Sequence, residues 1–165
     1  RGKALGAAWY LPQERQITPK DQLLDQMCSV LGGRAAEEIV FGEISTGAQN
    51  ALERATKQAY DMVSIYGMSD KVGMLSYYDS TGQSDFSFTK PYSEKTAELI
   101  DAEVKDMVSA AYERAKQLLS DHREQHRQVA ELLIEREVIF SDDLENILGK
   151  RPWTEEEETQ QPEEL

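Results

Sequence analysis

Apolar side chains recur every three or four residues along most of this chain, which is the spacing that places them on one face of an α-helix. The pattern predicts helices over about residues 18–42, 48–66, 93–119, 124–136 and 141–149. We expect Thr18 to be the N-cap of the first helix with Pro19 at its first position, because threonine accepts a backbone hydrogen bond there and proline needs no donor. Ser141 is expected to cap the last helix, and Gly149 to end it.

Glycines mark two places in this helical pattern. Gly32 and Gly33 lie inside the first helix, where glycine costs stability relative to alanine. A helix tolerates such a pair where it bends or where another backbone comes close. We therefore interpret the segment "GGRAAEE" as a place of tight helix packing. Gly67 is expected to follow the second helix as its C′ residue.

Two short segments have the composition of β-strands. The first is "ALGAAWYLP" (Ala4–Pro12), which is apolar and aromatic and is ended by Pro12. The second is "KVGMLSYYD", residues 71–79. The sequence thus predicts a mainly α-helical fold with two short β-strands.

The 165-residue chain carries a formal net charge of −13, which bears on its partners. A surface this acidic repels phosphate backbones and anionic lipid, so nucleic-acid binding and direct adhesion to a membrane surface are disfavoured. Six glutamates lie in the tail "TEEEETQQPEEL", residues 154–165, which has almost nothing apolar to bury. We expect a domain over residues 1–153 followed by a disordered acidic tail.

The number of cysteines and the lengths of the apolar runs exclude further kinds of structure. Cys28 is the only cysteine, so an intramolecular disulfide and a zinc ribbon are both excluded. Its apolar helical neighbours indicate a buried thiol. No apolar run approaches the ~20 residues that cross a bilayer, so membrane contact is expected only through segments outside this chain.

The two histidines, His122 and His126, are four residues apart in "HREQH". On a helix their rings point the same way, and two imidazoles can share a metal. The metalloprotease pattern H-E-x-x-H, however, needs glutamate directly after the first histidine, whereas Glu124 is two residues on. The polar neighbours favour a solvated helix face, and a small metal-binding protein is the alternative.

Several longer strings together carry a family resemblance. They are "ALGAAWYLP", "LGGRAAEEIVFG", "STGAQNALERATKQAYDMVSIYGMSDKVG", "KPYSEKTAELIDAEVKDMV" and "LLIEREVIFSDDLENILGKRPW". In this order they resemble the C-terminal part of the peptidase domain of the membrane-anchored AAA+ zinc metalloproteases, the FtsH/m-AAA/i-AAA family. The resemblance covers residues 2–153, and its first string looks most like bacterial members.

This resemblance implies an ATP-dependent zinc endopeptidase that degrades unfolded membrane and soluble proteins in protein quality control. It implies a homo-hexamer, with ATP and Mg²⁺ bound by a module outside this chain. It also implies anchoring in the inner membrane with the peptidase in the cytoplasm for a bacterial protein, or in an organelle membrane for a eukaryotic one. Zinc in the family is held by two histidines of an H-E-x-x-H helix and by one aspartate of a later helix.

The resemblance also places the third zinc ligand. The family motif G-A-x-N-D reads Gly47-Ala48-Gln49-Asn50-Ala51 in this chain, so Ala51 occupies the aspartate position. The H-E-x-x-H pattern does not occur in these 165 residues. Neither Asn50 nor Glu53 can simply replace the ligand, because they lie about 100° and 200° around the helix from Ala51. We expect no catalytic residue and no intact metal site in this chain, whether Ala51 arose by design or by natural loss.

Substrate binding and the alternative function also follow from the resemblance. The strand that contains Leu5, Gly6, Ala7 and Ala8 is expected to bind extended substrate through main-chain hydrogen bonds, or else only to close the core. The alternative to an enzyme fragment is a non-catalytic helical module that assembles a hexameric ring or binds substrates.

Overall fold

The computed structural model describes residue 8 and residues 17–77 and 91–150. Its elements are α1 (Lys20–Phe41), η1 (Thr46–Ala48), α2 (Gln49–Ser64), α3 (Glu94–Asp121), α4 (Arg123–Arg136) and α5 (Ser141–Leu148). The predicted helices are therefore all present, and the fold is mainly α-helical. None of the described helices is long and apolar enough to cross a bilayer.

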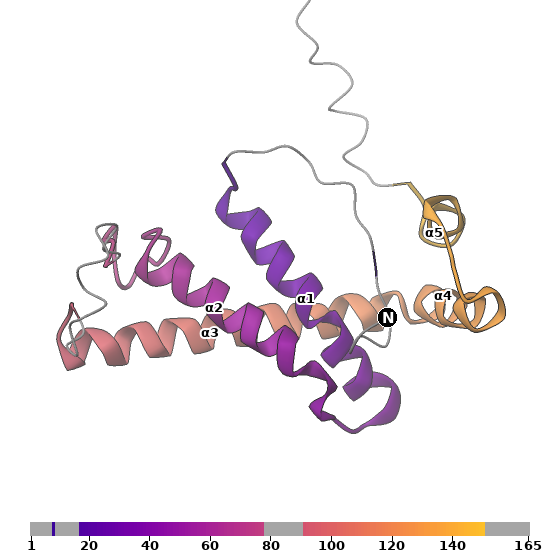
Figure 1. The fold of residues 1–165 in the computed structure, drawn as a ribbon, viewed down its shortest axis with the longest axis horizontal. Helices are drawn as coiled ribbons and strands as arrows, with labels where there is room; N and C mark the ends of the chain where they lie inside the picture. Colours follow the sequence, from indigo (N-terminus) through magenta and orange to yellow (C-terminus); the bar gives the residue numbers. More distant parts are fainter. Residues whose placement is uncertain (1–7, 9–16, 78–90, 151–165) are drawn as a thin grey trace, which may run out of the picture.

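Helices α1, α2 and α3 form the body of the molecule, with α1 and α2 packed on each other and both on the long α3 (Figure 1). Their facing sides bury one apolar core, made of Met27, Leu31, Ala55, Ala59, Met62, Val63, Ile100, Val104 and Ala111. A smaller cluster of Cys28, Ala35 and Ala115 continues it toward the ends of α1 and α3. The thiol is buried, as the sequence predicts, and burial raises the pKa of Cys28.

Polar contacts join the three helices around the core. Gln58 of α2 donates a hydrogen bond from Nε2 to the carbonyl oxygen of Leu23 at 2.8 Å. The Tyr112 hydroxyl of α3 donates to Glu38 of α1, and Lys116 Nζ lies 3.4 Å from the same carboxylate. The hydrogen bond from Tyr112 is the main reason why the pKa of Glu38 is lowered. These contacts fix how α1 crosses α3.

Helices α4 and α5 extend from the far end of α3, to the right in Figure 1. Among the described helices, α4 packs only on α3 and α5, and α5 packs only on α4. Arg136 joins the pair through an ion pair with Asp143 at 2.9 Å. Neither helix has a buried side chain in the described part of the chain.

Two predicted helix caps are wrong by one residue. Pro19, not Thr18, is the N-cap of α1, with an extended ψ of 156° and no side-chain cap. Phe140, not Ser141, is the N-cap of α5, and its N–H donates to Asp143 Oδ2 at 3.0 Å. Apolar spacing finds a helix but does not decide which of two neighbouring residues leaves helical geometry first.

The second predicted strand is wrong for the residues that the structure describes. Residues 71–77 follow a tight turn with one isolated β-bridge between Ser69 and Gly73. The buried Ser69 accepts a hydrogen bond from the Val72 N–H at 3.2 Å and donates one to Glu103 Oε2 at 2.7 Å. Because Ser69 is bonded to α3, the chain curls there and does not extend. The first predicted strand, apart from Ala8, and the acidic tail lie outside the described residues.

The tight packing predicted at Gly32 and Gly33 is also wrong. Helix α1 continues through both, and a Cβ added at either would meet no atom within 4 Å. The motif matters for its charged residues instead, because these hold the loop that follows.

Candidate active-site segment at the start of helix α2

A short loop leads from α1 to α2 and carries the motif in which Ala51 lies. Helix α1 ends at Gly42, whose N–H donates to the carbonyl oxygen of Glu38 at 3.0 Å. The φ of Gly42 is +70°, a left-handed conformation that glycine adopts without steric cost. The chain reverses here and enters η1 at Thr46.

Ser45 is the centre of the hydrogen bonds that fix this loop. Its Oγ donates to Glu37 Oε1 at 2.7 Å, and its N–H lies 3.3 Å from Glu37 Oε2. The same Oγ accepts from the Gly47 N–H at 3.1 Å, which satisfies a free donor at the start of η1. Arg34 Nη1 donates to the Ser45 carbonyl oxygen at 2.6 Å. Both polar groups of the Ser45 backbone and its hydroxyl are thereby tied to α1.

The electrostatics of the loop follow from these bonds. The pKa of Glu37 is lowered, chiefly because its carboxylate accepts the hydrogen bond from the Ser45 hydroxyl. Arg34 contributes less, with its Nη1 3.9 Å from Glu37 Oε2. The ionised carboxylate is the acceptor that this loop uses, so the loop is best held when Glu37 is charged.

The first turn of α2 lies directly after this anchored loop. Ala48 is buried, with 6 % of its surface exposed, and it fixes the turn against the body. Ala51 is half-buried, whereas its neighbours Asn50 and Glu53 are exposed. The methyl group of Ala51 has no atom that can bind a metal, so the structure fixes the position of this residue but supplies no ligand there.

The structure describes little of the predicted substrate-binding set. Ala8, the one residue of the substrate-binding set that the structure describes, is exposed and outside the helices. Leu5, Gly6 and Ala7 lie outside the described residues, so this assignment stays a prediction.

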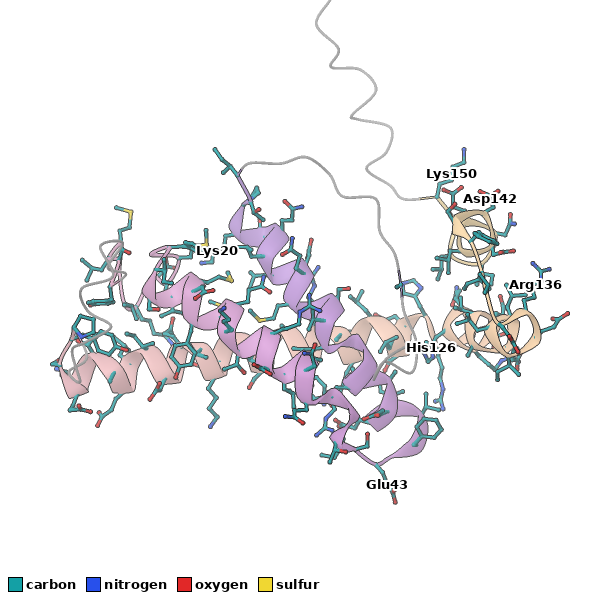
Figure 2. The ribbon with its side chains drawn as sticks, in the orientation of Figure 1. Lys20, Glu43, His126, Arg136, Asp142 and Lys150 are labelled. Atoms are coloured by element: carbon teal, nitrogen blue, oxygen red, sulfur yellow. The ribbon has the colours of Figure 1, made fainter. Side chains whose placement is uncertain are left out.

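The histidine pair lies away from the loop. His122 joins α3 to α4 and is exposed, and the half-buried His126 donates its backbone N–H to the His122 carbonyl oxygen at 2.9 Å. Figure 2 shows His126 beside the start of α4, well apart from Glu43 of the α1–α2 loop. In the described part of the chain, no three His, Cys, Asp or Glu side chains gather as a metal site requires. The described residues therefore do not fit a zinc centre.

Arg34 and Glu37 are functional candidates that the apolar pattern did not reveal. They are three residues apart on α1 and therefore on one face of it. The signal that could have found them is the Ser-Thr-Gly turn, since a serine ahead of a helix is often bonded by a nearby polar side chain.

Comparison with known proteins decides the family. The model of peptidase family M41 matches residues 1–147. The chain belongs to peptidase family M41. Within it, the chain is 64 % identical over 153 residues to the ATP-dependent zinc metalloprotease FtsH of Parabacteroides distasonis. It is 49 % identical over 156 residues to the mitochondrial ATP-dependent zinc metalloprotease FTSH 10 of Arabidopsis thaliana. It is 48 % identical over 155 residues to the mouse mitochondrial inner membrane m-AAA protease component AFG3L2.

These M41 relatives are much longer than the part that is compared. The matches cover 93 %, 94 % and 94 % of this chain but only 22 %, 19 % and 19 % of the three relatives. The chain thus spans about a fifth of their length. The resemblance to the FtsH/m-AAA family is confirmed, and M41 membership makes this a chain of the ATP-dependent zinc metalloprotease family.

Proposed function

We propose that this chain is the C-terminal part of the peptidase domain of an ATP-dependent zinc metalloendopeptidase, and that with Ala51 it does not hydrolyse peptides. The observation that carries the proposal is the position of Ala51 in the first turn of α2, on a loop anchored by Arg34, Glu37 and Ser45. The whole enzyme degrades unfolded membrane and soluble proteins in protein quality control. Zinc would supply a Lewis acid that activates water, and this chain offers it no complete ligand set.

The proposal extends to the rest of the protein. We infer a homo-hexamer, with ATP and Mg²⁺ bound by a module outside this chain. We infer that its anchor lies in the bacterial inner membrane with the peptidase in the cytoplasm, or in an organelle membrane in a eukaryote. The names of two M41 relatives support two parts of this inference, since one is called ATP-dependent and the other a component of a mitochondrial inner-membrane protease. Leu5, Gly6, Ala7 and Ala8 would add an extended substrate as a neighbouring strand.

The loss of a carboxylate accounts for the expected inactivity. A catalytic zinc site uses three protein ligands and keeps a further position for water. Alanine in place of one ligand removes a negative charge from beside a divalent cation. Because hydrogen bonds fix the loop before α2, the backbone does not readily rotate to bring Asn50 or Glu53 to the ligand position that Ala51 occupies.

The test restores the carboxylate. The Ala51→Asp variant, in a longer protein that contains an H-E-x-x-H helix, is expected to bind one zinc ion and to hydrolyse casein. Asn50→Asp is the matched control, because it adds the same charge one residue away on an exposed position. Zinc bound by Ala51→Asp without hydrolysis would refute the assignment, and so would equal activity of Asn50→Asp.

The same alanine, Ala51, is also compatible with a second function, that of a non-catalytic module. A chain that lacks a ligand atom can still serve as a helical module that assembles a ring or binds substrates. Restored hydrolysis in Ala51→Asp would show that only the ligand is missing. Retained ring assembly without any hydrolysis in that variant would favour the non-catalytic module.

A further inference from the structure

Met74 has the most exposed of the large apolar side chains that the structure describes, with 95 % of its surface accessible to solvent. The other four methionines of the chain are covered. Met27 and Met62 are fully buried in the core, and Met68 and Met107 are half-buried against it. A thioether is therefore fully presented to solvent at this one position.

The backbone on both sides of Met74 is held, so this exposure does not come from a loose loop. The Gly73 N–H donates to the Ser69 carbonyl oxygen at 2.8 Å, and the Leu75 N–H donates to the Gly73 carbonyl oxygen at 2.9 Å. The second bond makes Met74 the central residue of a three-residue turn. Its Cα also lies against Gly67, where an added Cβ would come within 3.2 Å of it. With its backbone seated on Gly67, Met74 extends its side chain into solvent.

The thiol of Cys28, which is the other kind of oxidisable sulfur in the chain, is withheld from solvent. A thiol reacts with oxidants as the thiolate. Cys28 is buried, and burial raises its pKa, so the thiolate is scarce near neutral pH. A thioether needs no deprotonation before it reacts. Of all the sulfur atoms in the chain, the one in Met74 is thus the most open to an oxidant in solution.

We propose that Met74 is a reversible oxidation site, at which a peroxide converts the thioether to methionine sulfoxide before it oxidises any other sulfur of this chain. The Sδ lone pair attacks one peroxide oxygen, the O–O bond breaks and an S–O bond forms. Sulfur loses two electrons and the peroxide gains them. With hydrogen peroxide, the proton of the transferred oxygen passes to the departing hydroxide, which leaves as water. Methionine sulfoxide is reduced back by dedicated reductases, so the change is reversible.

The position of Met74 lets the chain take up this oxygen without damage to its core. A sulfoxide is polar, and it disrupts a core in which it is buried. At Met27 or Met62 the new oxygen would lie in a fully buried apolar site, where a polar group without a hydrogen-bond partner is costly. At Met74 water solvates it. This oxidation needs neither zinc nor peptidase activity, so it stands apart from the proposed function.

A time course with hydrogen peroxide tests this site in the 165-residue chain. Peptide mapping by mass spectrometry follows the sulfoxide at each of the five methionines and the oxidation state of Cys28. Because susceptibility follows exposure, Met74 is expected to oxidise on the order of tenfold faster than the two half-buried methionines, and faster still than the two in the core. The two methionine sulfoxide reductases, one for each epimer, should together return the oxidised chain to its original mass.

Two leucine variants separate Met74 from its neighbours. Met74→Leu keeps an apolar side chain of similar size and should remove the fast phase of oxidation, while circular dichroism keeps the helical signal. Met68→Leu is the matched control, because Met68 lies in the same connection between α2 and α3, and it should leave the fast phase unchanged. The chain oxidised at Met74 alone should unfold at the same urea midpoint as the reduced chain, because its sulfoxide lies in solvent.

Four results would contradict this site. One is sulfoxide that forms at Met68 or Met107 as fast as at Met74. Another is loss of the Cys28 thiol before Met74 reacts. The third is a fast phase of oxidation that persists in Met74→Leu. The last is a urea midpoint that falls when Met74 alone is oxidised, since this would mean that its side chain packs on the body of the molecule.

Discussion

Replacing Gly67 by alanine should destabilise the body of the molecule for two separate reasons. Its φ is +62°, where an L-residue with a Cβ costs about 1–2 kcal/mol. The added Cβ would also lie 3.2 Å from the Cα of Met74 and 3.3 Å from the Leu75 nitrogen. These are backbone atoms, so no rotamer change can relieve the contact.

The contact is expensive because the loop around Gly67 is braced. The Tyr77 N–H donates to the Ser64 carbonyl oxygen at 2.8 Å, and the Met68 N–H donates to the Met62 carbonyl oxygen at 2.9 Å. Moving Met74 away would strain these bonds. Overpacking against atoms that cannot move costs about 1–3 kcal/mol, so with the conformational cost we expect Gly67→Ala to lower the free energy of unfolding by roughly 2–5 kcal/mol.

Urea unfolding, followed by circular dichroism, gives this difference from the transition midpoint and the slope m. With m of about 2 kcal/mol/M, the midpoint should fall by roughly 1–2.5 M. Gly42→Ala is the matched control, because Gly42 also has a positive φ but an added Cβ would meet nothing within 4 Å. The Gly42→Ala variant should lose only the part of the unfolding free energy that comes from the backbone conformation, about 1 kcal/mol. Gly32→Ala, in open helix, should gain about 0.5–1 kcal/mol. A loss in Gly67→Ala no larger than that in Gly42→Ala would refute the steric argument.

Three further predictions concern the site, the pH dependence and the core. Ser45→Ala removes the acceptor of the Gly47 N–H and the donor to Glu37, so amide hydrogen exchange at the start of α2 should accelerate; unchanged exchange would contradict the anchoring. The pKa of Glu103 is lowered by the hydrogen bonds from Lys71 and then Ser69, so its folded-state pKa lies below its unfolded one. The stability that ionised Glu103 contributes is therefore fully present above its unfolded-state pKa, near 4.5, and is lost as the pH falls through its lower folded-state pKa. In thermal unfolding, the melting temperature of Glu103→Gln should consequently fall less between neutral and acidic pH than that of the unchanged chain. Met62→Ala empties a fully buried position and should cost about 2–5 kcal/mol in urea unfolding, so a loss below 1 kcal/mol would contradict the assigned core.

Helical periodicity in the sequence predicts most of the fold, because each helix of the body buries one face along its own length. In the sequence of α2, apolar residues recur at helical spacing through Leu52, Ala55, Ala59, Met62 and Val63, and all of these except Leu52 are buried. Tyr66 continues the same spacing but is exposed. The helix ends just before it, so its side chain no longer follows the helical angle.

Apart from the helix caps and the glycine pair, the misses share a physical cause, which is dependence on distant residues. Residues 71–77 have a strand-like composition, but the bond from Ser69 to Glu103, 34 residues away, curls the chain. The anchoring of Ser45 by Arg34 and Glu37 spans 11 and 8 residues, with no period to reveal it. The assignment of Ala51 to a metal position came from a motif and not from packing, and it stays a prediction.

In the part of the chain that the structure describes, half of the buried apolar positions are alanines, namely Ala35, Ala48, Ala55, Ala59, Ala97, Ala111 and Ala115. A methyl group removes little surface from water, so most hydrophobic stabilisation rests on a few large side chains such as Met27, Leu31 and Ile100. The alanines instead set how near the helix axes can come. Substitutions in the body are therefore constrained in two opposite ways. The few large buried side chains do not tolerate replacement by smaller ones, and the many buried alanines do not tolerate replacement by larger ones.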